Sequence, residues 1–138
     1  MKKKIPLIEA VRIYNSLQQM ANKELDYSAA HAMVMTKAEL EPHIQFFAER
    51  ERSLLEAFAE KGPDAEPITD EMGRYTVPKA AIRDFEAERE KLNAVEVEFL
   101  VRKLRTLPEK ITPAQLETLV TAFELPVEES EVDVTDGR

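Results

Sequence analysis

Apolar side chains recur at helical spacing through the first part of the chain. Pro6 suits the first turn of a helix, where its missing N–H leaves no hydrogen bond unmade. The apolar positions that follow are Leu7, Ile8, Val11, Ile13, Tyr14, Leu17, Met20 and Ala21. They predict a helix over 6–22, after which Asp26 or Ser28 caps a second, longer helix. Two amphipathic helices with a short connection predict an antiparallel hairpin over 6–60.

The second helix carries a heptad seam. Its members are Ala30, Met33, Lys37, Leu40, Ile44, Phe47, Glu51, Leu54 and Phe58. Pro42 removes a backbone N–H within this helix, so a bend or a break is expected there. The first helix is too short to cover the whole seam, so a later part of the chain or another chain must cover the remainder.

The large apolar members of this seam are the candidate interaction residues. They are Leu40, Ile44, Phe47, Leu54 and Phe58. Because they offer more apolar length than the first helix can cover, we expect the protein to be a homo-oligomer, most simply a dimer through the long helix.

Turn residues and a change of period mark the second half of the chain. Asp70 opens and Gly73 closes a turn of the kind that joins two strands. A helix is predicted over 78–93. The apolar residues Val95, Val97, Phe99 and Val101 then recur at every second position. This period predicts a strand with one buried face, which pairs with the hairpin around Asp70.

The last predicted helix begins with a capping box. Thr112 is the N-cap, Pro113 occupies the first helical position, and Gln115 completes the box. The predicted buried face consists of Leu116, Leu119, Val120 and Phe123, and Pro126 ends the helix.

These elements predict an α+β fold that is mostly α. It contains an N-terminal antiparallel helical hairpin with a long second helix, a small two- or three-stranded antiparallel sheet, and additional C-terminal helices. A chain of 138 residues fits one domain. We expect that domain over 1–126, with the hairpin over 6–60 and a small α+β part over 64–125. Residues 127–138 are acidic and poor in apolar side chains, which predicts a disordered tail.

The net charge of −8 narrows the classes of partner. A duplex DNA binder usually carries the opposite sign, so we expect a protein partner and no nucleic acid. The chain has no cysteine, which excludes thiolate chemistry and disulfides. It has no apolar run long enough for a signal peptide or a membrane span. The expected location is the cytoplasm of whichever cell makes the protein.

Residues that carry chemistry are few and scattered. His31 and His43 lie too far apart along one helix to share a metal, and a Glu39–His43 pair lacks a third ligand. The acidic residues Asp84, Glu86, Glu88 and Glu90 alternate with basic ones and fit a solvated helix face. No phosphate-binding glycine loop or nucleophile motif is present. We therefore expect no catalytic residue, no metal and no cofactor.

The order of several motifs resembles a known family. The motifs are Tyr27-Ser28 before the long helix, a charged stretch with Glu49, Glu51, Arg52, Leu54 and Leu55, the turn Asp70-Glu71-Met72-Gly73, an acidic helix, and the strand from Val95 to Glu98. Together they resemble a family of small proteins of unknown function encoded by tailed bacteriophages and prophages, over residues 5–125. The resemblance implies a phage origin and a non-enzymatic protein, with a partner from the phage or the host, and with the host cytoplasm or, alternatively, the virion as its location. It leaves open a virion or assembly component and a host-takeover factor.

Three functional hypotheses follow. The first is a non-enzymatic interaction module, a phage structural, assembly or adaptor protein that acts through its helical hairpin. The second is an inhibitor of a host defence system or host enzyme that binds through its acidic surface. The third is an enzyme, and this is the hypothesis that the sequence supports least.

Overall fold

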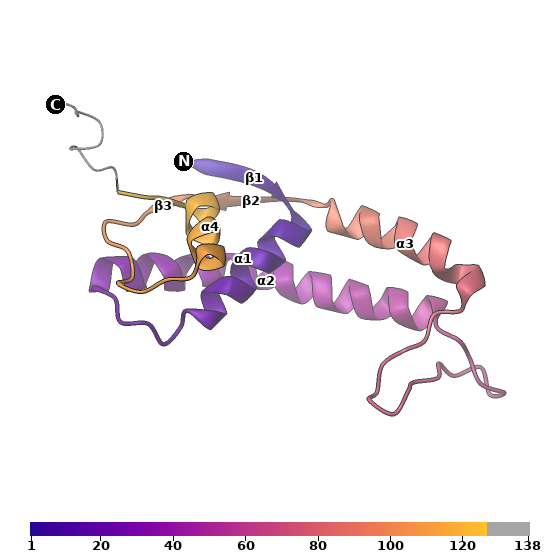
Figure 1. Cartoon of the computed structure of the whole chain (residues 1–138). Helices are drawn as coiled ribbons and strands as arrows, with labels where there is room; N and C mark the ends of the chain where they lie inside the picture. The colour runs from indigo at the N-terminus through magenta and orange to yellow at the C-terminus, as the bar shows by residue number, and fades with distance from the viewer. Residues whose placement is uncertain (127–138) are drawn as a thin grey trace. The chain divides into compact units, whose positions relative to one another are not determined.

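A computed structural model describes residues 1–126, so the predicted tail over 127–138 lies outside the described residues. The fold is α+β and mostly helical, with a hairpin-like arrangement of the first two helices, as predicted (Figure 1). The helices are α1 (Leu7–Gln19), α2 (Tyr27–Phe58), α3 (Lys79–Asn93) and α4 (Pro113–Ala122). The strands are β1 (Lys2–Pro6), β2 (Glu96–Leu100), β3 (Arg102–Lys103) and β4 (Phe123–Glu124). Within residues 1–126, no helix is long and apolar enough to cross a membrane.

The main strand pairs with the N-terminus rather than with the predicted hairpin. β1 and β2 form a two-stranded antiparallel sheet, flanked by hydrogen bonds from Val101 N to Met1 O (2.7 Å) and from Leu7 N to Val95 O (2.7 Å). The segment around Asp70 forms only two isolated bridges. The predicted partner of β2 was therefore wrong. That segment is polar and exposed, so it offers β2 no apolar face to pack against.

The second sheet is a short parallel pair. β3 lies beside β4, with Arg102 opposite Phe123 and Lys103 opposite Glu124. Leu104 N then donates to Glu124 O at 2.9 Å. The pairing joins the end of the strand region to the end of α4. The predicted strand region reached Arg102, whereas β4 and its pairing with β3 were not predicted.

Helix α2 continues through Pro42 as one helix of 32 residues, so of the predicted bend or break the break is absent, and the bend stays a prediction. Pro42 and Ala38, whose carbonyl loses its helical donor, are both exposed. An exposed carbonyl can be hydrated, which makes the missing hydrogen bond tolerable. At the start of α2, Ala29 N donates to Asp26 Oδ1 at 2.8 Å, which confirms Asp26 as the capping side chain.

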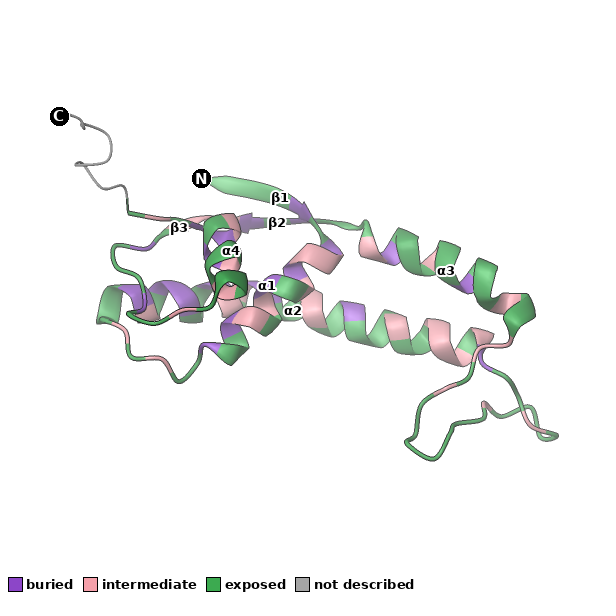
Figure 2. Cartoon of the chain, in the orientation of Figure 1, coloured by how far each residue is buried: buried purple, intermediate pink, exposed green. Residues whose placement is uncertain are grey.

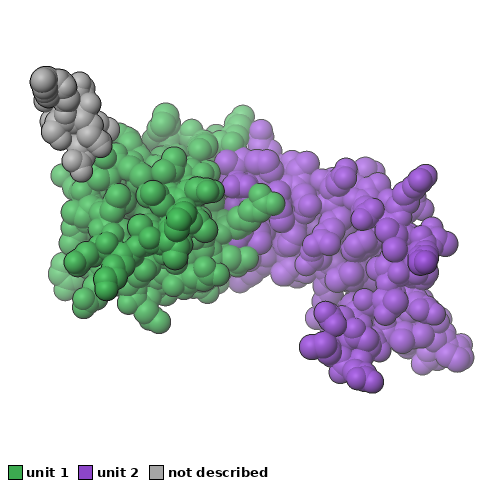
Figure 3. Space-filling view, in the orientation of Figure 1, with its two compact units in different colours: residues 1–4, 12–41, 98–138 green, residues 5–11, 42–97 purple. Residues whose placement is uncertain are grey.

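The chain forms two compact units (Figure 3). Unit 1 comprises residues 1–4, 12–41 and 98–138, and unit 2 comprises residues 5–11 and 42–97. Each unit therefore combines segments that are distant in sequence. The sequence-based prediction divided the chain in sequence order instead, into a hairpin over 6–60 and an α+β part over 64–125.

Each unit has its own apolar core. In unit 1 the buried side chains include Ile13, Leu17, Met20, Met33, Leu40, Phe99, Leu104, Leu119 and Phe123. In unit 2 they include Leu7, Phe47, Phe85, Leu92 and Val97. Exposed residues predominate on α3 and on the loop before it (Figure 2). The sequence alternation in β2 thus places Val97 and Phe99 inward, as predicted.

Helix α4 begins as predicted but faces the core with different residues. The capping box is present, since Gln115 N donates to Thr112 Oγ1 (3.1 Å) and Thr112 N donates to Gln115 Oε1 (3.2 Å). Leu119 is buried, whereas Leu116 and Val120 are exposed, so the predicted buried face was partly wrong. The inward side consists of Leu119 and Ala122, and Phe123 follows in β4.

The turn at Asp70 is held by its own side chain. Asp70 Oδ1 accepts hydrogen bonds from Met72 N and Arg74 N, both at 2.9 Å, and Gly73 adopts a left-handed φ of 77°. Gly73 N also donates to Asp70 O at 3.0 Å. These contacts confirm a turn over 70–73 and make it locally rigid.

Phe99→Ala is expected to lower the free energy of unfolding by about 3–5 kcal/mol, because Phe99 is fully buried and its removal leaves a cavity. Chemical denaturation measures the loss. Leu116→Ala is the control, since Leu116 is exposed and its truncation should cost under ~1 kcal/mol. Equal losses for the two variants contradict the described core.

The pKa of Asp70 is expected below 3.8, because the backbone N–H of Arg74 above all, and that of Met72, stabilise its carboxylate. A lowered pKa in the folded protein stabilises the turn above pH 3.8. This stabilisation is lost as the pH falls through the folded-state pKa. NMR titration of the Asp70 carboxyl carbon measures the value, and a pKa at or above 3.8 contradicts the turn geometry.

Candidate protein-interaction surface

The five predicted interaction residues are all at least partly covered. Leu40 and Phe47 are buried, and Ile44, Leu54 and Phe58 are half-buried. In unit 2, α3 packs along the second half of α2. The rings of Phe58 and Phe85 meet edge to face at 6.0 Å. The sequence allowed either a later part of the chain or another chain to cover the seam, and in the structure a later part of the same chain covers it. Binding of a partner by these residues stays a prediction.

The pairs between the two helices show their relative direction. Phe58 meets Phe85, and Glu51 Oε2 lies 2.9 Å from Arg89 Nη2. The later residue of α2 thus meets the earlier residue of α3, so the helices run antiparallel (Figure 1). This arrangement leaves two long edges where side chains of both helices meet solvent.

One edge of the α2–α3 pair is hollowed into a groove of about 310 Å³. Its lining includes Phe46, Arg50, Leu54, Glu88, Lys91, Leu92 and Val95, all in unit 2. Leu54 belongs to the predicted set, whereas the other six were not predicted as site residues. We call this feature the α2–α3 groove.

The α2–α3 groove combines exposed apolar surface with excess positive charge. The exposed fractions of Phe46 and Val95 are 47% and 42%, which is high for large apolar side chains. Lys91 Nζ lies 2.9 Å from Glu88 Oε2, and this hydrogen bond raises the pKa of Lys91. Arg50 forms no ion pair with any residue of the described chain. The groove therefore holds two cations and one carboxylate.

Phe46 was not predicted because it lies outside the heptad seam, from which the interaction residues were chosen. Consecutive helical residues point about 100° apart, so Phe46 and Phe47 do not both face the seam. Phe47 is buried in the core and Phe46 lies in the groove. The adjacent aromatic pair was the signal in the sequence for a second apolar direction on α2.

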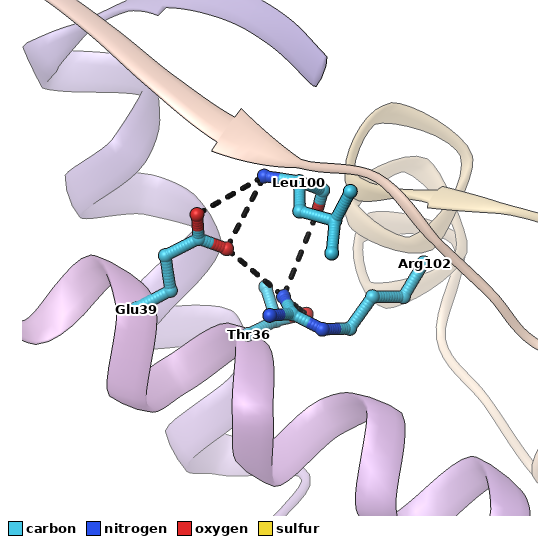
Figure 4. A network of polar contacts seen from close by, with 4 residues as sticks. All are labelled: Thr36, Glu39, Leu100 and Arg102. Carbon is cyan, nitrogen blue, oxygen red and sulfur yellow. Dashed lines mark hydrogen bonds and ion pairs between the residues drawn. The ribbon is translucent and has the colours of Figure 1, made fainter. Parts of the chain in front are cut away.

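Glu39 takes part in a polar network in unit 1 rather than in a pair with His43 (Figure 4). Its carboxylate accepts hydrogen bonds from Leu100 N, at 3.2 Å to each oxygen, and lies 3.0 Å from Arg102 Nη1. Arg102 Nη1 also donates to Thr36 Oγ1 at 3.1 Å. The network connects α2 with the strand region. Because both carboxylate oxygens are occupied, the arrangement fits a structural contact better than acid–base chemistry.

The other candidate chemical residues do not converge. His31 is exposed and His43 is half-buried, and Asp84, Glu86 and Glu90 are exposed on α3. In the part of the chain that the structure describes, no three His, Asp or Glu side chains are grouped so as to hold a metal ion. The expectation of no catalytic residue, metal or cofactor stays a prediction.

No protein-family model, curated protein or solved structure matches this chain. The resemblance to the phage family and the expected phage origin therefore stay predictions.

Glu39→Ala is expected to lower the free energy of unfolding by about 1–3 kcal/mol, because it leaves the partly buried Arg102 and the N–H of Leu100 without their acceptor. Thermal or chemical denaturation measures the effect. Glu41→Ala, an exposed carboxylate on the same helix, is the matched control and should change stability by less than ~0.5 kcal/mol. A Glu39 effect no larger than that of Glu41 contradicts the structural role of the network.

Proposed function

We propose that the protein is a non-enzymatic interaction module of a tailed phage or prophage, with a structural, assembly or adaptor role. The observation that carries the proposal is the α2–α3 groove, with its exposed Phe46 and Val95. The resemblance of the sequence motifs supports the phage origin. The host cytoplasm or the virion is the location that this role implies.

The partner that fits the α2–α3 groove is an amphipathic helix of another protein. A third helix laid between two antiparallel helices buries apolar side chains at i, i+3, i+4 and i+7 and completes a small bundle. Phe46 and Val95 provide the exposed apolar surface for these anchors. A helix fits better than a small molecule because the groove is open to solvent and not enclosed.

Charge further specifies the partner helix. Arg50 has no counter-ion among residues 1–126, and Lys91 with Glu88 adds no net charge. A carboxylate on the partner helix, next to its apolar face, would pair with Arg50. The chain as a whole carries a charge of −8, so this positive edge is a local exception that favours an acidic helix at this position.

The charge distribution favours an alternative, namely an inhibitor of a host defence system or host enzyme. Unit 2 contains fourteen Asp and Glu against eight Lys and Arg, a net charge of −6. Such a surface would steer the protein toward a basic partner. The two functions differ in the face used, since the inhibitor acts through exposed carboxylates and the module through the α2–α3 groove.

Phe46→Asp is expected to abolish capture of the partner, because a carboxylate would replace the apolar anchor site. Affinity purification from infected or expressing cells identifies candidates. A helical peptide from the captured protein is then titrated against purified variants. Binding should weaken at least about tenfold with Phe46→Asp, a loss of ~1.4 kcal/mol or more.

The matched control is Ile82→Asp, which changes an exposed apolar residue of α3 outside the α2–α3 groove. It should leave peptide binding unchanged, and circular dichroism should show both variants folded. Undiminished binding by Phe46→Asp contradicts the groove. Loss of binding on charge reversal of Glu86 and Glu90, with Phe46→Asp active, supports the inhibitor instead.

A further inference from the structure

Unit 1 contains a small, mainly apolar pocket whose lining includes two lysines. It lies between the end of α1 and the start of α2 and has a volume of about 120 Å³. Leu17, Leu25, Met33 and Val34 provide apolar walls, and Lys23 and Lys37 provide the charge. Val34 is 61% exposed and marks an accessible side of the pocket. No carboxylate lines it, although the chain is acidic overall.

The two lysines are oriented by neutral groups. Lys23 Nζ donates to Lys110 O at 2.9 Å, and Lys37 Nζ donates to Gln18 Oε1. Lys37 also lies 6.0 Å from the centre of the Tyr14 ring. Among the described residues, neither lysine pairs with a carboxylate. The pocket therefore favours a ligand that brings an apolar group together with negative charge.

The size of the pocket limits that ligand to one side chain. Pockets that hold small-molecule ligands measure roughly 300–1,000 Å³, and a cavity of about 150 Å³ holds one benzene ring. A space of about 120 Å³ matches a single apolar side chain of a protein. The ligand is thus an exposed apolar residue with acidic neighbours.

The chain itself presents such a residue on a rigid turn in unit 2. Met72 is 76% exposed, and the hydrogen bonds that Asp70 accepts from Met72 N and Arg74 N hold the turn that carries it. Glu71 directly precedes Met72. Asp70 Oδ2 lies 3.3 Å from Arg74 Nε, and Arg74 Nη2 donates to Met72 Sδ at 3.3 Å, so the carboxylate of the turn that is left for Lys23 and Lys37 is that of Glu71. The loop over 60–76 contains five Asp and Glu against two Lys and Arg, a net charge of −3.

We propose that Met72 of one molecule inserts into the unit 1 pocket of a second molecule, with the acidic turn facing Lys23 and Lys37. Three observations support this contact, namely charge complementarity, the match of one side chain to the pocket, and the exposure of Met72. The turn that inserts and the pocket that receives it are different surfaces, so the contact is heterologous. After one such contact, one molecule still has a vacant pocket and the other still has an uninserted turn. Repetition of the contact builds a ring or a filament. This association uses neither Phe46 nor Val95 and is independent of the α2–α3 groove.

Sedimentation velocity over a concentration series tests the association with the full chain. The wild type should grow beyond a dimer as its concentration rises. Met72→Gln replaces the apolar anchor with a polar group of similar size, and Val34→Asp places a carboxylate at the pocket. Each variant alone should associate at least about tenfold more weakly, because an apolar side chain loses its burial. Both positions are exposed, so the variants should stay folded by circular dichroism.

Mixing the two variants gives the decisive comparison. Met72→Gln keeps an intact pocket and Val34→Asp keeps an intact turn, so an equimolar mixture should form a dimer and nothing larger. The control is Val120→Asp, an exposed apolar position of unit 1 outside the pocket, which should associate like the wild type. High salt should weaken association of the wild type, since exposed charges are screened.

Several results overturn the proposal. They are a wild type that stays monomeric, variants that associate normally, a mixture that stays monomeric, and a control that fails as the variants do. A wild type that is monomeric but binds an acidic peptide with a central methionine assigns the pocket to another protein. Phe46→Asp should leave self-association unchanged, and Met72→Gln should leave partner capture unchanged, which separates this test from that of the α2–α3 groove.

Discussion

The structure depends on burial of the apolar seam of α2. A helix of 32 residues with apolar side chains at heptad spacing cannot remain exposed in water, since each large side chain contributes about 1.5–3 kcal/mol on burial. In unit 1, Met33 and Leu40 of α2 belong to the same core as buried side chains from α1, β2 and α4. In unit 2, α3 packs on Phe58 of α2. Segments that are far apart in sequence must therefore pack against this one helix, which explains why both units are discontinuous in sequence.

Internal cover of the seam decides where a partner finds apolar surface. Exposed apolar residues lie beside the seam or away from it, and they include Phe46 and Val95 in one unit and Val34 in the other. The α2–α3 groove and the unit 1 pocket are both lined by more lysine and arginine than carboxylate. In a chain of net charge −8, this shared charge is the reason that both proposals invoke acidic, partly apolar segments of proteins.

Local signals in the sequence predicted the helices well and the contacts poorly. The capping box at Thr112 and Gln115 involves residues three apart, so it is visible in sequence alone. Strand β1 was missed because Lys2, Lys3 and Lys4 give no apolar alternation; it exists through pairing with a segment over ninety residues away. The α2–α3 groove was missed because its walls come from two helices, and only Phe46 beside Phe47 hinted at it.

Cover of the α2 seam by the same chain, and not by a partner, can be tested by native-state hydrogen exchange of the α2 amides. The exchange is measured at a dilution where the protein is monomeric and at a concentration where association is expected. Protection over 44–58 should be the same in both samples. Protection of that segment that appears only on association would show that another chain covers the seam, and internal cover would then be wrong.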